Sequence, residues 1–191
     1  MQKPRRRCLG AIFLLLFAPW LGAQEAGVAL VDDKDIQVSR RGEGWLVEGS
    51  FTVPVAPAVA WVVLTDFDHM GRFLTNLSVS QVLERQGNVL QVEQRGTARF
   101  GLFSFKFQSL REITLTPVSH IHARGLSGNI KHFISALSVA EEGSATRLTY
   151  RAEMEPDFWL PSLLGPSLLR HEMAEQFSAM VAEMLRRAGR N

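Results

Sequence analysis

Apolar and polar residues alternate along most of the chain after Trp45, which is the pattern of β-strands with one buried face. Turn residues such as Gly87-Asn88 and Gly143-Ser144 interrupt the alternation at nearly regular intervals. Strands are predicted over 45–53, 78–85, 89–99, 102–116, 119–126, 131–140 and 146–155. This succession predicts an antiparallel sheet of about six to seven strands.

One face of the predicted sheet is apolar and the reverse face carries charges, so one face should be covered and the other solvated. The inward positions in three of the strands are Phe103, Phe105, Phe107, Phe133, Ser135, Leu137, Val139, Leu148, Tyr150, Ala152 and Met154. Too little chain remains for a second sheet. The cover of the apolar face is therefore predicted to be helical.

Two helical segments are predicted directly after the first strand. Pro57 suits the first turn of a helix, and no breaker follows before Leu64. Asp66 offers a carboxylate that can cap a short second helix over 69–74.

The last predicted helix lies within residues 162–187 and is amphipathic. Gly165-Pro166 should kink this helix or delay its regular part to Ser167. Its apolar stripe consists of Leu169, Met173, Phe177, Met180, Val181 and Met184. Its solvent side is predicted to carry Glu172, Glu175, Glu183 and Arg186. The expected fold class is α+β, with a curved antiparallel sheet wrapped around this helix.

The first 23 residues have the three parts of a secretory signal peptide. Lys3 and 5–7 form a basic region, 9–21 form an apolar core, and Leu21-Gly22-Ala23 offers a small-residue cleavage site. The apolar run is shorter than the roughly 20 residues that a membrane span needs. We therefore expect a signal peptide over 1–23, a lead-in segment over 24–44, a ligand-binding domain over 45–188, and a periplasmic location.

Removal of the signal peptide would change the charge of the protein. The whole chain has 21 basic and 19 acidic residues, but four basic residues lie in the signal, which leaves 17 against 19. No basic stripe lies on a predicted helix, so nucleic acid is not an expected partner. Cys8 is the only cysteine and falls within the signal, so the exported part has no thiol chemistry.

Histidines provide the strongest candidates for catalysis or metal binding. His69 lies beside Asp66, and such a pair can act as acid and base or bind a metal, although helix capping explains the same residues. His120 and His122 share one face of a predicted strand, but Arg124 falls on that face and disfavours a cation. We expect a solvated outer face there. No cofactor or metal is expected.

Two stretches, FTVPVAPAVAW over 51–61 and LTDFDHMGRFL over 64–74, together with the order of elements, resemble the START-like superfamily, also called SRPBCC or helix-grip. Within it the chain is most similar to the polyketide cyclase/dehydrase and coenzyme Q-binding branch. The similarity covers roughly 45–187. It implies a hydrophobic cavity between the concave face of the sheet and the terminal helix. It does not select a function, because the superfamily includes lipid carriers, quinone binders, hormone receptors and ring cyclases.

The cavity implied by this resemblance would be lined by aromatic, aliphatic and thioether side chains, with the hydroxyls of Ser135 and Tyr150 to orient a ligand. The predicted ligand-binding residues are Phe103, Phe105, Phe107, Phe133, Ser135, Leu137, Tyr150, Met154, Met173, Phe177 and Met180. The alternative is that the same residues fill a solid core. Residues 125–129 are predicted to form a hairpin turn, and 158–160 an apolar lip that could touch a membrane.

These patterns favour an exported, non-catalytic protein that binds or carries a hydrophobic lipid-like, isoprenoid or aromatic molecule. One alternative is a cyclase or hydrolase that uses Tyr150 as an acid or His69 as a base. Another alternative is a module that binds a further envelope protein.

Overall fold

The computed structural model of the protein describes residues 31–100, 103–157 and 165–189. Eight strands form one antiparallel sheet. They are β1 (Ile36–Arg41), β2 (Gly44–Val53), β3 (Leu77–Gln86), β4 (Val89–Phe100), β5 (Phe103–Thr116), β6 (His120–Gly128), β7 (Ile130–Glu142) and β8 (Ala145–Pro156). Their order across the sheet is β1-β2-β8-β7-β6-β5-β4-β3. Strands that are neighbours in sequence therefore pair from β3 to β8, and β1 pairs with β2. The last strand, β8, also pairs with β2 and so joins the two groups into one sheet.

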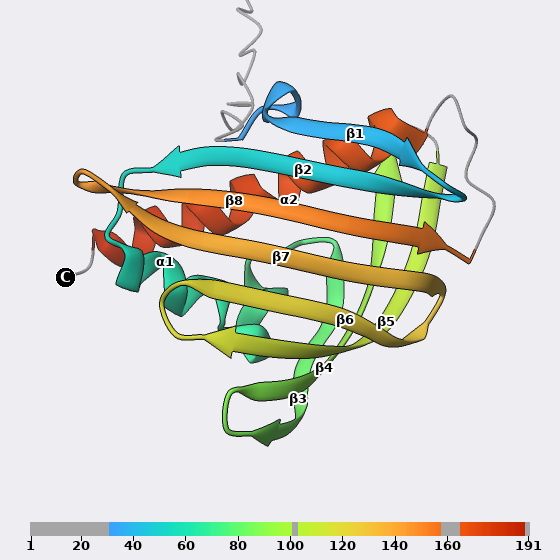
Figure 1. The fold of residues 1–191 in the computed structure, drawn as a ribbon, viewed down its shortest axis with the longest axis horizontal. Coiled ribbons are helices and arrows are strands. Elements are labelled where there is room, and N and C mark those ends of the chain that lie inside the picture. The colour runs from blue at the N-terminus through green and yellow to red at the C-terminus, as the bar shows by residue number, and fades with distance from the viewer. Residues whose placement is uncertain (1–30, 101–102, 158–164, 190–191) are drawn as a thin grey trace, which may run out of the picture.

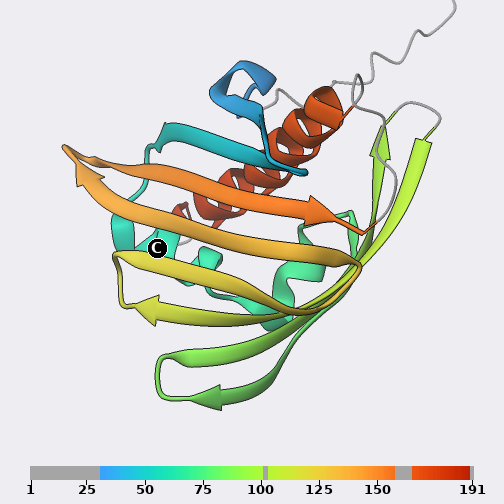
Figure 2. The same cartoon turned by 45° about the vertical axis from the view of Figure 1, so that its right-hand side comes forward.

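Within the described ranges, four helical elements accompany the sheet. They are the short 3-10 helices η1 (Asp33–Asp35) and η2 (Phe67–Arg72), and the α-helices α1 (Pro57–Leu64) and α2 (Gly165–Ala188). The strands curl around α2, which crosses behind β2, β8 and β7 (Figure 1, Figure 2). Among the described residues, no helix has the length and apolarity required to cross a bilayer.

The α+β fold class, with its curved sheet and terminal helix, is confirmed. The sheet has one strand more than the six to seven expected, because β1 lies within the stretch expected to be a lead-in. This strand contains only two apolar residues, Ile36 and Val38, and ends in Arg40 and Arg41. Polar and charged residues suit an edge strand, whose outer side has no neighbour to cover it. The alternation over so short a segment was too weak to predict it.

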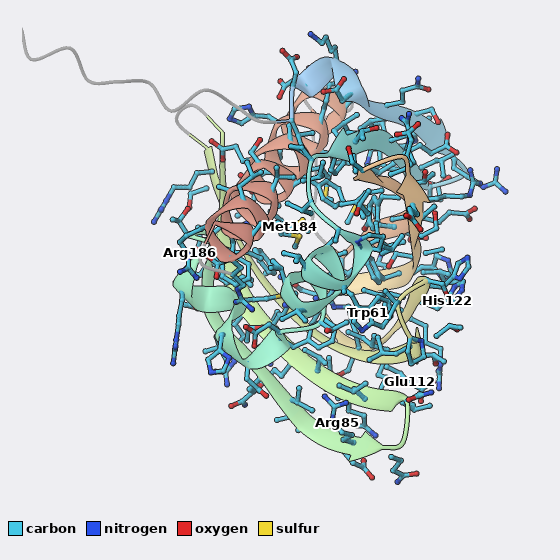
Figure 3. The ribbon with its side chains drawn as sticks, turned by 90° about the vertical axis from the view of Figure 1, so that its left-hand side faces the viewer. Trp61, Arg85, Glu112, His122, Met184 and Arg186 are labelled. Carbon is cyan, nitrogen blue, oxygen red and sulfur yellow. The ribbon has the colours of Figure 1, made fainter. Side chains whose placement is uncertain are left out.

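The two faces of the sheet follow the predicted alternation. Leu148 and Ala152 of β8 are buried, and their partners across the register in β7, Val139 and Ser135, are buried as well. Arg147, whose side chain points the opposite way, pairs with Glu142 of β7. His122 and Glu112 likewise lie on the side of the sheet that faces away from α2 (Figure 3).

Helix α2 buries Phe177, Val181 and Met184 of the predicted stripe, while Leu169, Met173 and Met180 are half-buried. Phe177 is buried and packs edge-on against Phe51 and Tyr150, with ring centroids 5.0 and 5.2 Å apart. Met184 of α2 is fully buried, and its side chain points from the helix toward the rest of the molecule (Figure 3). Pro166 lies in the first turn of the helix, where its missing N–H has no intrahelical partner to lose, so Gly165-Pro166 marks the start of the described helix.

The prediction that Glu172 and Glu183 face solvent was wrong, since their residues are only 7% and 8% exposed. Glu183 is covered by its own neighbours. The guanidinium groups of Arg186 and Arg187 donate hydrogen bonds to its carboxylate, with 2.7 Å between Arg187 Nε and Glu183 Oε1. Helical periodicity locates the apolar stripe, but it does not show which charged side chains fold back over a flanking carboxylate.

The capping role expected for Asp66 is also corrected, because its side chain makes no cap hydrogen bond. Its carboxylate instead binds His69 Nδ1 at 2.6 Å and Arg187 Nη2 at 2.7 Å. Burial opposes ionisation of Asp66, but the hydrogen bonds from Arg187 and His69 outweigh it, so the pKa of this carboxyl is lowered. Asp66 therefore joins η2 to the C-terminal end of α2.

Candidate ligand-binding cavity

A cavity of about 260 Å³ lies between the concave face of the sheet and α2. Its walls come from strands β2 to β8 and from α1, η2 and α2. The volume is near the lower end of the range of small-molecule sites, about 300–1,000 Å³. The lining is mostly apolar, which suits the same class of site.

Most of the predicted ligand-binding residues meet at this cavity. Those that line it are Phe105, Phe107, Phe133, Ser135, Leu137, Tyr150, Met154, Met173, Phe177 and Met180. Phe103 belongs to β5, but its side chain lies outside the described part of the structure. Contact of these residues with a ligand stays a prediction.

The cavity walls differ from a closed core in how completely their side chains are covered. Phe105, Phe107, Met173 and Met180 are only half-buried although they face the interior between sheet and helix. A side chain in a close-packed core is covered on every side. These four residues line the cavity, and the space beside them is space that a close-packed core would fill.

The sequence reasoning missed the most unusual group of the cavity, Arg111 of β5. The period of two that points Phe105 and Phe107 inward continues through Ser109 and Arg111 to Ile113, and all of these residues line the cavity. The alternation along this strand therefore indicates that Arg111 faces the same side as Phe105 and Phe107. It was overlooked because arginine is rarely placed inside a protein.

The Arg111 side chain is half-buried, and its Nε atom is covered by protein and has no hydrogen-bond partner among the described residues. Its Nη2 atom donates a hydrogen bond to Gln94 Oε1. Its central carbon lies 5.4 Å from the ring centroid of Phe133, within cation–π range. Burial lowers the pKa of Arg111, and the neighbouring Tyr150 opposes this shift. An arginine side chain still stays protonated at neutral pH.

A chain of hydrogen bonds holds Gln94 in position for Arg111. The Gln94 amide nitrogen donates to Ser80 Oγ at 3.0 Å, and the Ser80 hydroxyl donates to the carbonyl oxygen of Phe67 at 2.6 Å. The amide nitrogen of Gln94 is thereby occupied, and its oxygen faces Arg111. Residues of β4, β3 and η2 thus fix the orientation of the guanidinium.

Tyr150 and Ser135 lie on the same wall as Arg111. Burial raises the pKa of the Tyr150 phenol, while Arg111 and a hydrogen bond with Ser135 lower it by less. The phenol is therefore neutral at physiological pH. It can donate one hydrogen bond to a ligand atom or accept one.

Glu172 is the acidic residue of the lining. Its two carboxylate oxygens accept hydrogen bonds from the backbone N–H of Arg99 at 2.7 Å and from Asn76 Nδ2 at 3.3 Å. Burial raises the pKa of Glu172, and these hydrogen bonds oppose that shift. Glu172 is buried because Arg99 of β4 and Asn76, which precedes β3, lie against this flank of α2, a contact between distant segments that helical periodicity does not show.

The histidines considered for chemistry lie elsewhere. His69 is half-exposed and binds Asp66, and it is not among the residues that line the cavity. His120 and His122 are exposed and stack on the outer face with ring centroids 6.0 Å apart, as expected for a solvated face. In the described residues, no group of three histidine, cysteine or acidic side chains is placed to hold a metal ion.

The turn predicted at 125–129 is shorter in the structure, because β6 continues to Gly128 and only Asn129 separates it from β7, which begins at Ile130. Asn129 fastens the turn to β5. Its Oδ1 accepts from the backbone N–H of Gln108 at 2.9 Å, and its Nδ2 donates to the carbonyl oxygen of Lys106 at 2.8 Å. The apolar segment 158–160, expected to form a lip, lies outside the described residues.

Comparison with known proteins agrees with this architecture. A family model described as polyketide cyclase/dehydrase and lipid transport matches residues 53–181. The chain therefore belongs to this family. A comparison with curated protein sequences gives no match.

Solved structures of low sequence identity share the fold. A STAR-related lipid transfer protein from Xanthomonas axonopodis has a TM-score of 0.65 at 12% identity, over 80% of this chain and 95% of that one. The Zhui aromatase/cyclase from Streptomyces sp. R1128 has a TM-score of 0.61 at 16% identity, over 76% and 93%. A START superfamily protein from Mycobacterium smegmatis has a TM-score of 0.64 at 12% identity, over 74% and 97%. The START-like fold is thus established, and it is shared by carriers and cyclases.

Proposed function

We propose that the protein is an exported, non-catalytic binding protein or carrier for a hydrophobic, lipid-like or aromatic small molecule. The observation that carries this proposal is the cavity of about 260 Å³ between the sheet and α2, lined mostly by apolar side chains. Membership in a family whose description includes lipid transport supports the proposal. The basic and apolar pattern of residues 1–23 supports export.

The chemistry of the lining also favours binding. The histidines lie away from the cavity, the Tyr150 phenol is held neutral, and the Glu172 carboxylate is engaged by two N–H donors. General acid–base catalysis works best with a group whose pKa lies near the operating pH and that can reach the substrate proton. Tyr150 lacks such a pKa, and both oxygens of Glu172 already serve a structural contact.

A cyclase remains the second candidate function, and one observation favours it. Burial raises the pKa of Glu172 toward the range in which a carboxyl can transfer protons, and this residue lines the cavity. The aromatase/cyclase from Streptomyces shares the fold. Turnover of a supplied polyketide that disappears in Glu172→Gln but not in Glu175→Gln, an exposed position on the same helix, would establish this function instead.

The test of the binding function is to purify the protein and identify any bound small molecule by native mass spectrometry. Ala123 lines the cavity, and Ala136 lies on the neighbouring strand with its side chain on the other face. We expect Ala123→Phe to occupy ligand space and weaken binding of an apolar ligand by about tenfold or more, whereas Ala136→Phe leaves it unchanged. Repeated preparations that are empty and bind no lipid, quinone or aromatic compound would reject the proposal.

A further inference from the structure

The charge of Arg111 is not balanced by a carboxylate in the described structure. The only hydrogen bond of its guanidinium there runs to the neutral amide oxygen of Gln94, and the Phe133 ring lies 5.4 Å from its central carbon. Glu172 shares the cavity, but its oxygens are bound by Arg99 and Asn76. The acidic residue next to Arg111 in sequence, Glu112, pairs with Arg124 on the outer face.

A cation that is partly removed from water and has no opposite charge beside it is unfavourable, because protein replaces part of its water without offering a counterion. Native proteins pair buried charges or use them to bind a ligand. The guanidinium also retains donors for such a ligand. It has five N–H groups. Nη2 serves Gln94, the unpartnered Nε–H is covered by protein, and the Nη1 N–H groups have no hydrogen-bond partner among the described residues.

The geometry of the remaining donors selects the kind of ligand group. The two Nη groups of an arginine present N–H donors in one plane, a fork that matches the two oxygens of a carboxylate. Gln94, held by Ser80, and the Phe133 ring keep this fork from turning freely. Tyr150 and Ser135 add hydroxyl groups beside it.

We infer that the ligand is an apolar carboxylic acid bound as its anion, with the carboxylate on the Arg111 guanidinium and the apolar body against the aromatic and methionine walls of the cavity. This inference rests on the proposed binding function and names its ligand class. A neutral quinone or alcohol could accept a hydrogen bond from Arg111, but it would leave the cation unbalanced. Only an anionic head group both accepts the hydrogen bonds of the donor fork and balances the positive charge of Arg111.

The experiment compares octanoate with 1-octanol, which have the same number of carbon atoms, on the purified full chain at neutral pH by isothermal titration calorimetry. Nile red, a neutral apolar dye, reports separately on whether the cavity accepts an apolar molecule. The variant Arg111→Gln removes the charge and can keep a hydrogen bond to Gln94. The control Arg124→Gln removes an arginine of the outer face that is paired with Glu112.

We expect the wild type and Arg124→Gln to bind octanoate about ten- to a hundredfold more tightly than 1-octanol, the effect of a hydrogen-bonded charge pair. Arg111→Gln should lose this preference and still bind Nile red. The inference is overturned if the wild type binds both compounds equally, if it binds Nile red but not octanoate, or if Arg111→Gln keeps the preference. If the wild type binds none of the three probes, the proposed binding function fails as well. Should Arg111→Gln not fold, the wild-type preference alone decides the question.

Discussion

The junction between α2 and η2 gives the sharpest prediction about stability. Glu183 of α2 accepts hydrogen bonds from Arg186 and Arg187, and Arg187 continues to Asp66 at 2.7 Å. Arg186 lies at the C-terminal end of the helix (Figure 3). The hydrogen bond from Arg186 and that from Arg187 lower the pKa of Glu183 from 4.5 to about 2, against the opposing effect of burial. The carboxylate is thus held in its charged form by the fold.

The magnitude follows from the pKa. A fall from 4.5 to about 2 is equivalent to roughly 3 kcal/mol in favour of the folded protein when Glu183 is ionised. The side chain of Arg186 is 45% exposed, so solvent screens part of this effect. We therefore expect Glu183→Gln to lower the free energy of unfolding at pH 7 by about 1–2 kcal/mol.

The pH dependence has a definite sign. Because the folded-state pKa of Glu183 is depressed, the stabilisation is fully present above the unfolded value of 4.5 and disappears as the pH falls toward about 2. Urea unfolding of the wild type and Glu183→Gln, followed by circular dichroism between neutral and acid pH, measures the difference. The control is Glu175→Gln, an exposed glutamate of the same helix, which should change stability little. The reasoning is refuted if Glu175→Gln costs as much as Glu183→Gln, or if the difference persists at the acid end.

Three further predictions concern other parts of the molecule. The pKa of Glu172 is raised in the folded protein, so ionisation of this residue lowers the stability of the wild type as the pH rises past 4.5. Glu172→Gln cannot ionise, so in the same urea assay its stability relative to the wild type should increase from acid to neutral pH. Gly96→Ala would place a Cβ 2.1 Å from the carbonyl oxygen of Asn76 and 2.7 Å from the Phe107 ring, so it should lower the melting temperature clearly, while Gly71→Ala, with no atom nearer than 3.9 Å, should not. If the protein is exported as proposed, mass spectrometry of the periplasmic fraction should show a chain that begins at Gln24, and an intact chain retained in the cytoplasm would contradict this.

The fold could be predicted largely because strand patterns are local. Side chains of a strand alternate between two faces, so Leu148, Tyr150 and Ala152 reveal their common face within a few residues. The same logic placed the Met173–Met184 stripe of α2 against the sheet. Strand β1 was not predicted, because its two apolar residues are too few to define a period and its position depends on pairing with β2.

The cavity residues were predicted in part for the same reason. The inward phenylalanines and methionines follow from periodicity, and the resemblance to the START-like superfamily implied that they surround a cavity. The arrangement of the polar groups in the cavity could not be predicted from periodicity. Arg111 lies on the same period as Phe107, but its unusual position is visible only when Gln94, Phe133 and Tyr150 are brought around it from other strands.

The sequence by itself determined which residues form strands and helices and which face of each is apolar, because these properties depend on neighbours a few positions away. The tertiary structure decided whether the apolar faces close into a solid core or leave a cavity, since that depends on how well distant side chains fill the space between sheet and helix. It also decided the state of the charges. Asp66 binds Arg187 although the two residues lie far apart in the sequence, and Glu172 accepts a hydrogen bond from Arg99 of β4. Arg111 lines a cavity and has no carboxylate partner among the described residues. Each of these states depends on contacts between segments far apart in the chain.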